Sequence, residues 1–134
     1  MHYTKIVTSF LKNDEKILIL KRSDMVKSMK GLWSGVSGII EKDEKPLMRA
    51  KIEIFEEVGL EEIHIKLLKE SEQIKVESPQ YRNHKWEIFP FLFEAKNTDI
   101  KLNWENSEYK WIKVEEIKEF ETVPNLEQIL FRLL

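Results

Sequence analysis

The chain contains no cysteine among its 134 residues, and its apolar runs are short. The missing cysteines exclude disulfide bonds, thiolate metal sites and cysteine nucleophiles. A run as short as residues 17–20 cannot span a bilayer, and residues 1–5 lack the apolar stretch of a signal peptide. We therefore expect a cytoplasmic protein that makes no membrane contact.

Neither sign of charge is in large excess, because 22 Lys and Arg residues stand against 24 Asp and Glu residues, a net charge of −2. Without a basic excess, non-specific binding to nucleic acid is disfavoured, and we expect no nucleic-acid partner. Hydrophobic residues make up 42% of the chain and charged residues 34%, as in a folded globular protein. The length suits one domain over residues 1–134 with a single core.

Strand patterns dominate the chain. We expect strands over residues 3–11, 17–20, 63–76, 86–95 and 109–114, and one or two short strands over residues 33–41. Turns are expected at Asn13-Asp14 and at Ser78-Pro79.

Helices are expected at three places. Pro46 suits the first turn of a helix and Gly59 suits its end, which predicts a helix over residues 46–58. A short helix is predicted over residues 115–120, and a last helix near Pro124 carries an apolar stripe of Leu126, Ile129, Leu130 and Leu133. Because strands and helices do not alternate, we expect an α+β fold in which helices pack against a mixed sheet.

The helix over residues 46–58 carries three acidic residues on one face. Successive helical residues rotate by about 100°, so Glu53, Glu56 and Glu57 project together. Like charges at these spacings cost roughly 0.2–0.5 kcal/mol per pair. A hard divalent cation bound by oxygen atoms would offset that repulsion. The alternative interpretation is an acidic face that is simply solvated.

The other sides of this helix are apolar. One face carries Leu47, Ala50, Ile54 and Val58. Met48, Ile52 and Phe55 make a further side apolar, which predicts packing on more than one side, with the carboxylates lining a groove.

Residues 38–60 place this helix within a longer pattern. Gly38 and Glu44 precede Glu53, and Gly59 and Leu60 follow Glu57. The run resembles the Nudix box, G-x5-E-x7-R-E-U-x-E-E-x-G-U, in which U is a bulky aliphatic residue, at every fixed position except one. The remaining chain also fits the family's order of strands and helices. The resemblance implies a Nudix-type α/β/α sandwich and hydrolysis of the diphosphate bond in a nucleoside triphosphate or another nucleoside-diphosphate-linked substrate.

The resemblance also implies a metal site. Mg²⁺, or Mn²⁺ in its place, would be held by Glu53, Glu56 and Glu57 together with the carbonyl of Gly38, while Glu44 would act as a structural partner of these ligands. The three histidines show no ligand spacing, so no role is assigned to them.

A general base is expected from outside the box. In the family, a glutamate in the loop before the last strand reaches the metals, and Glu105 matches that position. Glu108 is the second choice. The alternative interpretation of Glu105 is an exposed acidic residue in a loop.

One position departs from the family pattern, because Ile52 stands where the family has an arginine. In the family that arginine pairs with the glutamates of the box. Arg49 lies four residues before Glu53 and should project between Glu53 and Glu56. We hypothesise that Arg49 supplies the missing guanidinium; the alternative is a solvated side chain.

Substrate contacts are predicted from position and chemistry. Arg22 ends a strand where relatives place a phosphate-binding arginine, and Asn125 resembles the base-reading asparagine of some family members. A surface role for Arg22 and a helix-start role for Asn125 are the alternatives. Trp33, Tyr81 and Trp86 are candidates for stacking on a base, although core packing is the expected role of Trp33.

Two other functions remain to be weighed. Loss of the arginine at position 52 would fit a nucleotide-binding or regulatory module that no longer hydrolyses its ligand, although the intact glutamates argue against this. An isoprenoid-diphosphate isomerase on the same fold would, by resemblance, need a cysteine, and the chain has none. A homodimer is compatible with the resemblance, because dimers are common in the family.

Overall fold

A computed structural model describes residues 2–78 and 82–134. Its strands are β1 (His2–Asn13), β2 (Lys16–Arg22), β3 (Trp33–Ser34), β4 (Val36–Ile39), β5 (Ile65–Glu70), β6 (Ile74–Glu77), β7 (His84–Ala95) and β8 (Asn106–Lys113). Its helices are α1 (Pro46–Val58), α2 (Leu126–Arg132) and the 3₁₀ helices η1 (Glu62–His64) and η2 (Val114–Glu119). None of the helices in this part of the chain has the length and apolar character that crossing a membrane requires.

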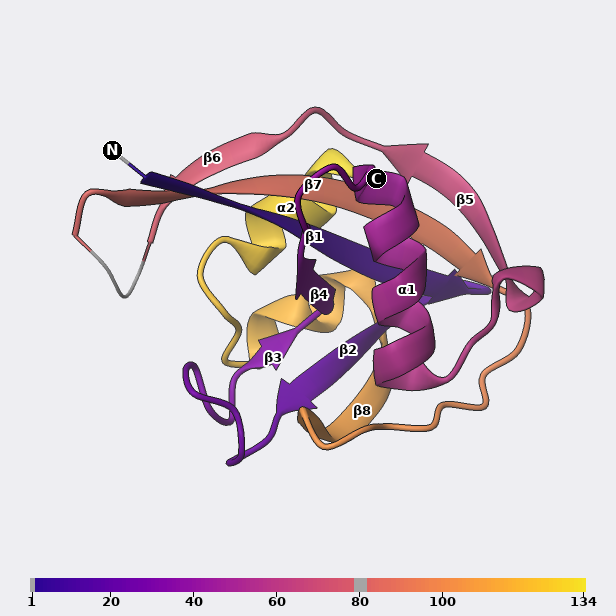
Figure 1. Cartoon of the computed structure of the whole chain (residues 1–134). Coiled ribbons are helices and arrows are strands. Elements are labelled where there is room, and N and C mark those ends of the chain that lie inside the picture. The colour runs from indigo at the N-terminus through magenta and orange to yellow at the C-terminus, as the bar shows by residue number, and fades with distance from the viewer. Residues whose placement is uncertain (1, 79–81) are drawn as a thin grey trace.

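The strands form one mixed sheet with the order β3-β2-β1-β7-β5. β4 pairs with β1, β6 with β7 and β8 with β2. β1 and β7 are parallel, and the other pairings between the named strands are antiparallel. Figure 1 shows β1 and β7 running side by side across the molecule. This pair forms the centre of the sheet. Helices α1 and α2 both pack against the sheet.

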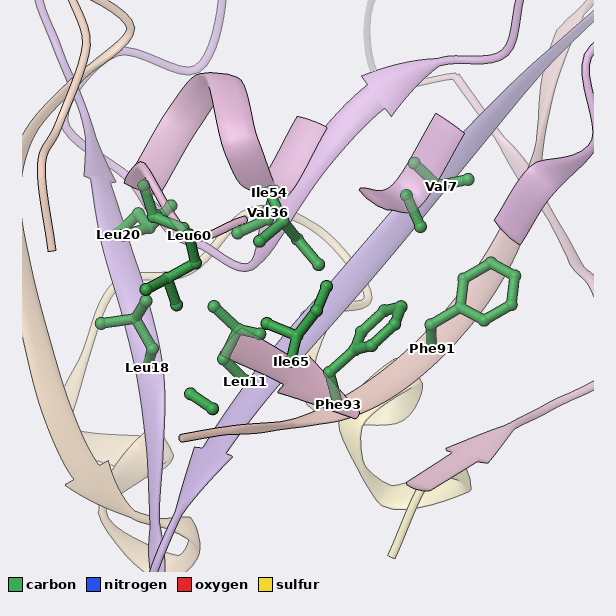
Figure 2. Packing of buried hydrophobic residues seen from close by; sticks show 13 residues of the cluster. Val7, Leu11, Leu18, Leu20, Val36, Ile54, Leu60, Ile65, Phe91 and Phe93 are labelled. Atoms are coloured by element: carbon green, nitrogen blue, oxygen red, sulfur yellow. The ribbon is translucent and has the colours of Figure 1, made fainter. Parts of the chain in front are cut away.

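Helices cover both faces of the sheet. Ala50, Ile54 and Val58 of α1 pack with Val7 and Leu11 of β1 in one core cluster, which Figure 2 shows from close by. The apolar stripe of α2 is buried in a second cluster, with residues Leu126, Ile129, Leu130 and Leu133. The α+β sandwich with a mixed sheet that the sequence predicts is therefore confirmed.

Helix α1 begins and ends where the sequence predicts. Pro46 opens it, and Gly59 follows it with a φ of 77°, in the left-handed region that glycine tolerates best. The Gly59 N–H donates to the Phe55 carbonyl over 3.0 Å, which closes the last turn. The expectation that α1 packs on more than one side is wrong, because Met48 and Phe55 are 57% and 55% exposed.

The single strand predicted over residues 63–76 is also wrong. The structure has η1, then β5 and β6, which pair with different parts of β7. Pro90 of β7 lies between the two pairings and has no N–H to offer a neighbouring strand. Ser71 between β5 and β6 donates to the Pro90 carbonyl over 3.3 Å. Of the predicted Ser78-Pro79 turn, Pro79 lies outside the described residues.

Candidate active site

A cleft of about 770 Å³ runs from the acidic edge of α1 to the start of β7. That volume suits a small organic ligand. Its acidic end is lined by Gly38, Glu53, Glu56 and Glu105, and Arg22 and Lys27 also line the cleft. Its opposite end is lined by Thr4, His84, Trp86, Pro124, Leu126 and Ile129. The predicted groove along the carboxylates of α1 is therefore present at Glu53 and Glu56, whereas Glu57 is buried and does not line it.

Gly38 brings β4 close to Glu53. A Cβ atom at position 38 would lie only 2.2 Å from Cδ and 2.3 Å from Oε2 of Glu53. Pairing with β1 holds Gly38 in place, since it lies opposite Val7 in the register. The glycine is thus required by close approach of the carboxylate, and no side chain fits between the strand and α1.

Gly38→Ala is expected to displace Glu53 and to destabilise the fold by roughly 1–3 kcal/mol, the usual cost of overpacking. Urea denaturation measures this cost. Because the collision is with Glu53, the same change in a Glu53→Ala background should cost clearly less, as a double-mutant cycle would show. Equal costs in the two backgrounds would mean that another contact makes alanine unfavourable at position 38.

Arg49 of α1 forms hydrogen bonds both to Glu44, in the loop before the helix, and to Glu53 on the helix. Its Nη2 and Nε donate to Oε2 and Oε1 of Glu44 over 2.7 and 3.0 Å, and its Nη1 donates to Oε2 of Glu53 over 3.0 Å. The expected position between Glu53 and Glu56 is therefore corrected, because Arg49 bridges Glu44 and Glu53. Hydrogen bonding to Arg49 lowers the pKa of Glu44. Hydrogen bonding, above all to Glu44, raises the pKa of Arg49.

Glu44 also fixes the loop before α1. Its Oε1 accepts a hydrogen bond of 2.6 Å from the Glu41 N–H. A charged group that is bound from two directions in this way has little freedom to move. The loop, Arg49 and Glu53 are thereby connected in one network, even though residue 52 is an isoleucine.

Two carboxylates of α1 are buried. Glu53 is 8% exposed and Glu57 only 4%. Burial raises the pKa of Glu53, which the hydrogen bond from Arg49 opposes. Burial raises the pKa of Glu57 well above its usual value, and the negative charges of Glu105 and Glu53 raise it further. Asn106 Nδ2 donates to Oε1 of Glu57 over 3.1 Å, which only partly opposes these effects.

The chemistry of these groups suits a divalent cation. Oε2 of Glu57 is buried with no hydrogen-bond partner among the described residues. An orphaned carboxylate oxygen among mutually repelling acids is a costly arrangement unless a positive charge joins it. Hard cations such as Mg²⁺ prefer oxygen donors of this kind. The described residues hold no ready-made group of three His, Asp or Glu side chains around one point, so the fit rests on the donors themselves.

The two candidate bases lie in different surroundings. Glu105 lines the cleft. Its negative charge raises the pKa of both Glu57 and Glu53. Its Oε1 accepts a hydrogen bond of 3.4 Å from Asn103 Nδ2. Glu108 pairs with Lys21 instead, with Nζ and Oε2 3.3 Å apart and both side chains largely exposed. The geometry therefore favours Glu105 over Glu108.

Arg22 lines the cleft, and its charge interacts with those of Glu57 and Glu105. Its Nε and Nη2 donate to the Ser28 carbonyl over 3.2 and 3.1 Å. Burial lowers the pKa of Arg22, against the opposing charges of Glu57 and Glu105. These bonds engage only part of the guanidinium fork, so further N–H groups of a cleft-lining arginine are suited to an anionic ligand.

The remaining predicted contacts divide into two groups. Trp86 lines the cleft, whereas Trp33 is buried and packs edge-on against Phe120, in the core as expected. Asn125 is exposed and stands at the start of α2, as in the alternative interpretation, with a φ of 69°, although within the described chain its side chain makes no capping hydrogen bond. Its neighbours in sequence line the cleft, although Asn125 itself does not. Tyr81 lies outside the described residues.

Sequence reasoning missed three residues of this region. Asn106 is buried beside Glu57, while Thr4 and His84 meet at the far end of the cleft. Each contact joins segments that are far apart in the chain, separated by 49 residues for Asn106 and Glu57 and by 80 for Thr4 and His84. The strand patterns that contain these residues indicate burial and exposure but not these pairings.

An acidic helix edge opens onto a ligand-sized cleft in an α/β/α sandwich. Proteins with this arrangement are suited to metal-assisted chemistry on small anionic ligands. A model of the NUDIX domain matches residues 2–133, and the chain belongs to the Nudix family, as the resemblance predicts. Nudix hydrolases generally use divalent metal ions.

Individual relatives share only a modest fraction of their residues with this chain. An RNA pyrophosphohydrolase from Bartonella clarridgeiae is 29% identical over 107 residues, which cover 66% of this chain and 61% of that protein. The chain thus spans less than two thirds of the length of this curated relative.

Solved structures match over nearly the whole fold. The MutT protein from Methanosarcina mazei Go1 is 24% identical, with 98% and 92% of the two chains covered and a TM-score of 0.76. The dihydroneopterin triphosphate pyrophosphohydrolase of E. coli is 17% identical, with 97% and 95% covered and a TM-score of 0.80. At these identities the structures establish the shared fold.

Proposed function

We propose that this chain is a Mg²⁺-dependent pyrophosphohydrolase that cleaves the diphosphate bond of a nucleoside triphosphate or another nucleoside-diphosphate-linked substrate. One observation supports this proposal above the others. The carboxylates of Glu53 and Glu57 are both buried on α1, Glu53 lines the acidic end of the cleft, and one oxygen of Glu57 has no partner among the described residues. Such a site is costly to a protein that does not bind a cation.

The box residues would hold the ion. Glu53, Glu56 and Glu57, with the Gly38 carbonyl, are the proposed ligands of Mg²⁺, and Mn²⁺ is the expected substitute. Held there, Mg²⁺ would supply charge neutralisation for the diphosphate and would lower the pKa of a water molecule for attack on phosphorus. Arg49 keeps the Glu53 carboxylate oriented, and Glu44 anchors Arg49 in turn.

The substrate would lie along the cleft. The guanidinium of Arg22 is the proposed contact for phosphate oxygens, because its planar N–H groups match their geometry. The Trp86 ring is the proposed stacking surface for the base. Asn125, next to two cleft-lining residues, remains one proposed contact to the base.

Glu105 is the proposed general base, which accepts the proton of the attacking water. Glu105→Gln keeps the shape of the side chain and removes its basicity, so kcat is expected to fall about 100-fold, at the lower end of the range for such groups. Glu108→Gln is the matched control and should leave kcat unchanged, because Glu108 pairs with Lys21. Steady-state rates with a nucleoside triphosphate measure both. A loss in Glu108→Gln with none in Glu105→Gln would transfer the role to Glu108.

The competing proposal is a nucleotide-binding module that has lost hydrolysis with the arginine of the box. The bridge from Arg49 to Glu44 and Glu53 weakens that proposal, because a guanidinium is still bound to the catalytic edge. A second candidate substrate is the 5′ end of RNA, which the RNA pyrophosphohydrolase relative suggests despite the lack of a basic excess. We further propose a cytoplasmic location.

A substrate panel tests the proposal. Nucleoside triphosphates, a dinucleoside tetraphosphate and a 5′-triphosphorylated RNA are incubated with the protein and Mg²⁺ or Mn²⁺. Release of phosphate or pyrophosphate that stops on chelation is the expected result. Tight nucleotide binding without release would establish the binding module instead.

A further inference from the structure

The end of the cleft opposite the acids carries a pair of polar side chains. Thr4 Oγ1 and His84 Nε2 are hydrogen-bonded at 2.5 Å, and both residues line the cleft. Thr4 lies on β1 and His84 opens β7, and these strands are parallel neighbours. The pair is therefore held by the two central strands of the fold and not by a loop.

Alternate residues of these strands form the floor of the cleft. Side chains two apart point to the same face of a sheet. The residues of β1 and β7 that line the cleft follow this rule: Thr4, Ile6, Thr8, His84, Trp86 and Ile88. In the register Thr4 lies opposite Trp86 and Ile6 opposite Ile88, so the floor is continuous across the two strands.

The floor leads from the acids to the polar pair. Gly38, which touches Glu53, lies opposite Val7 of β1. Thr4 is three residues further along, a distance of about 10 Å at the rise of a strand. A ligand whose diphosphate lies at the acids thus has room for one nucleoside before it reaches the pair.

The surroundings of the pair are suited to a flat ring with a polar edge. Trp86 provides an aromatic surface, and Pro124, Leu126 and Ile129 provide an apolar wall. A hydroxyl and an imidazole can each donate and accept hydrogen bonds. A site built to bond a polar edge discriminates strongly against ligands that lack one.

We propose that the Thr4–His84 pair determines specificity by binding the polar edge of a nucleobase, so that the substrates are nucleotides and not simple polyphosphates. This inference rests on the proposed function, since the diphosphate must lie at the acids. The pair takes no part in bond cleavage. Its loss should therefore weaken nucleotide binding and leave the chemical step intact.

Thr4→Val tests the inference, because it removes the hydroxyl and keeps the shape of the side chain. The probes are the four nucleoside 5′-triphosphates and inorganic tripolyphosphate. For at least one nucleotide, KM is expected to rise about 3–10-fold, the value of one hydrogen bond, while kcat and the KM for tripolyphosphate stay within twofold. His84→Phe, which keeps a flat ring, should act in the same direction. Thr98→Val, at an exposed threonine outside the cleft, is the matched control.

Tryptophan fluorescence titration gives the same comparison as Kd values, independently of turnover. Nucleotides that bind without being hydrolysed, and bind more weakly to Thr4→Val, would contradict the proposed function but support the role of the pair. Unchanged KM and Kd values for every nucleotide, or an equal loss with tripolyphosphate, would overturn the inference about the pair while leaving hydrolysis in place.

Discussion

Replacing Arg49 with alanine is expected to reduce turnover by roughly 10²–10³-fold. The guanidinium holds Glu44 through two hydrogen bonds and Glu53 through a third, so its removal frees the buried Glu53 carboxylate from the one positively charged partner that it has among the described residues. A misplacement of about 1 Å at a reacting centre is enough to cost about 100-fold in rate. Steady-state kinetics with the best substrate of the panel measures the loss.

Two further variants identify the cause of that loss. Arg49→Lys should recover only part of the rate, because an ammonium group cannot bind Glu44 through two parallel bonds. Ile52→Arg in the Arg49→Ala background restores the arginine of the Nudix box and should recover more. Full turnover in Arg49→Ala would show that Arg49 is only a surface partner of the glutamates.

Glu57→Gln is expected to have opposite effects on activity and on stability. Turnover should fall about 10³-fold, since a charged ligand next to the diphosphate is lost. In the absence of metal the variant should be more stable at neutral pH by roughly 1–3 kcal/mol, because an unsatisfied buried charge has been removed. Thermal unfolding with a chelator present measures this gain, and Glu72→Gln in an exposed segment serves as the control.

The pH dependence of that gain follows from the raised pKa of Glu57. The pKa of the Glu57 carboxyl is higher in the folded than in the unfolded state. Its contribution to stability is therefore fully present when the pH is below the pKa of the unfolded state, and it is lost as the pH rises through the pKa of the folded state. The difference in Tm between Glu57→Gln and the natural chain should therefore be small near pH 4 and grow toward pH 8. A difference that shrinks with rising pH would show that Glu57 is stabilised, not destabilised, as an anion.

The bounds of α1 could be predicted because local residues set them. Pro46 has no N–H to lose at a helix start, and Gly59 accepts the left-handed backbone that ends the helix. The break between β5 and β6 depends on Pro90, a residue of the strand opposite, so residues 63–76 alone could not show it. The exposure of Met48 and Phe55 likewise depends on which elements lie beside α1, and the apolar periodicity of the helix does not reveal those neighbours.

The candidate site divides in the same way. Glu53, Glu56 and Glu57 share one helix, so their spacing alone brings them together. The helical spacing predicts only part of the contacts of Arg49, since its two bonds to Glu44 depend on how the preceding loop folds back. Asn106 and the Thr4–His84 pair reach the site through strand pairing between distant segments, which a single sequence does not specify.

A crystal structure with Mn²⁺ tests the central claim most directly, since the anomalous signal of manganese locates the ion. The account predicts a peak between the carboxylates of Glu53, Glu56 and Glu57, within ligand distance of the Gly38 carbonyl, and its absence from crystals of Glu57→Gln. A cleft without manganese, or manganese bound only at some other surface of the protein, would contradict it.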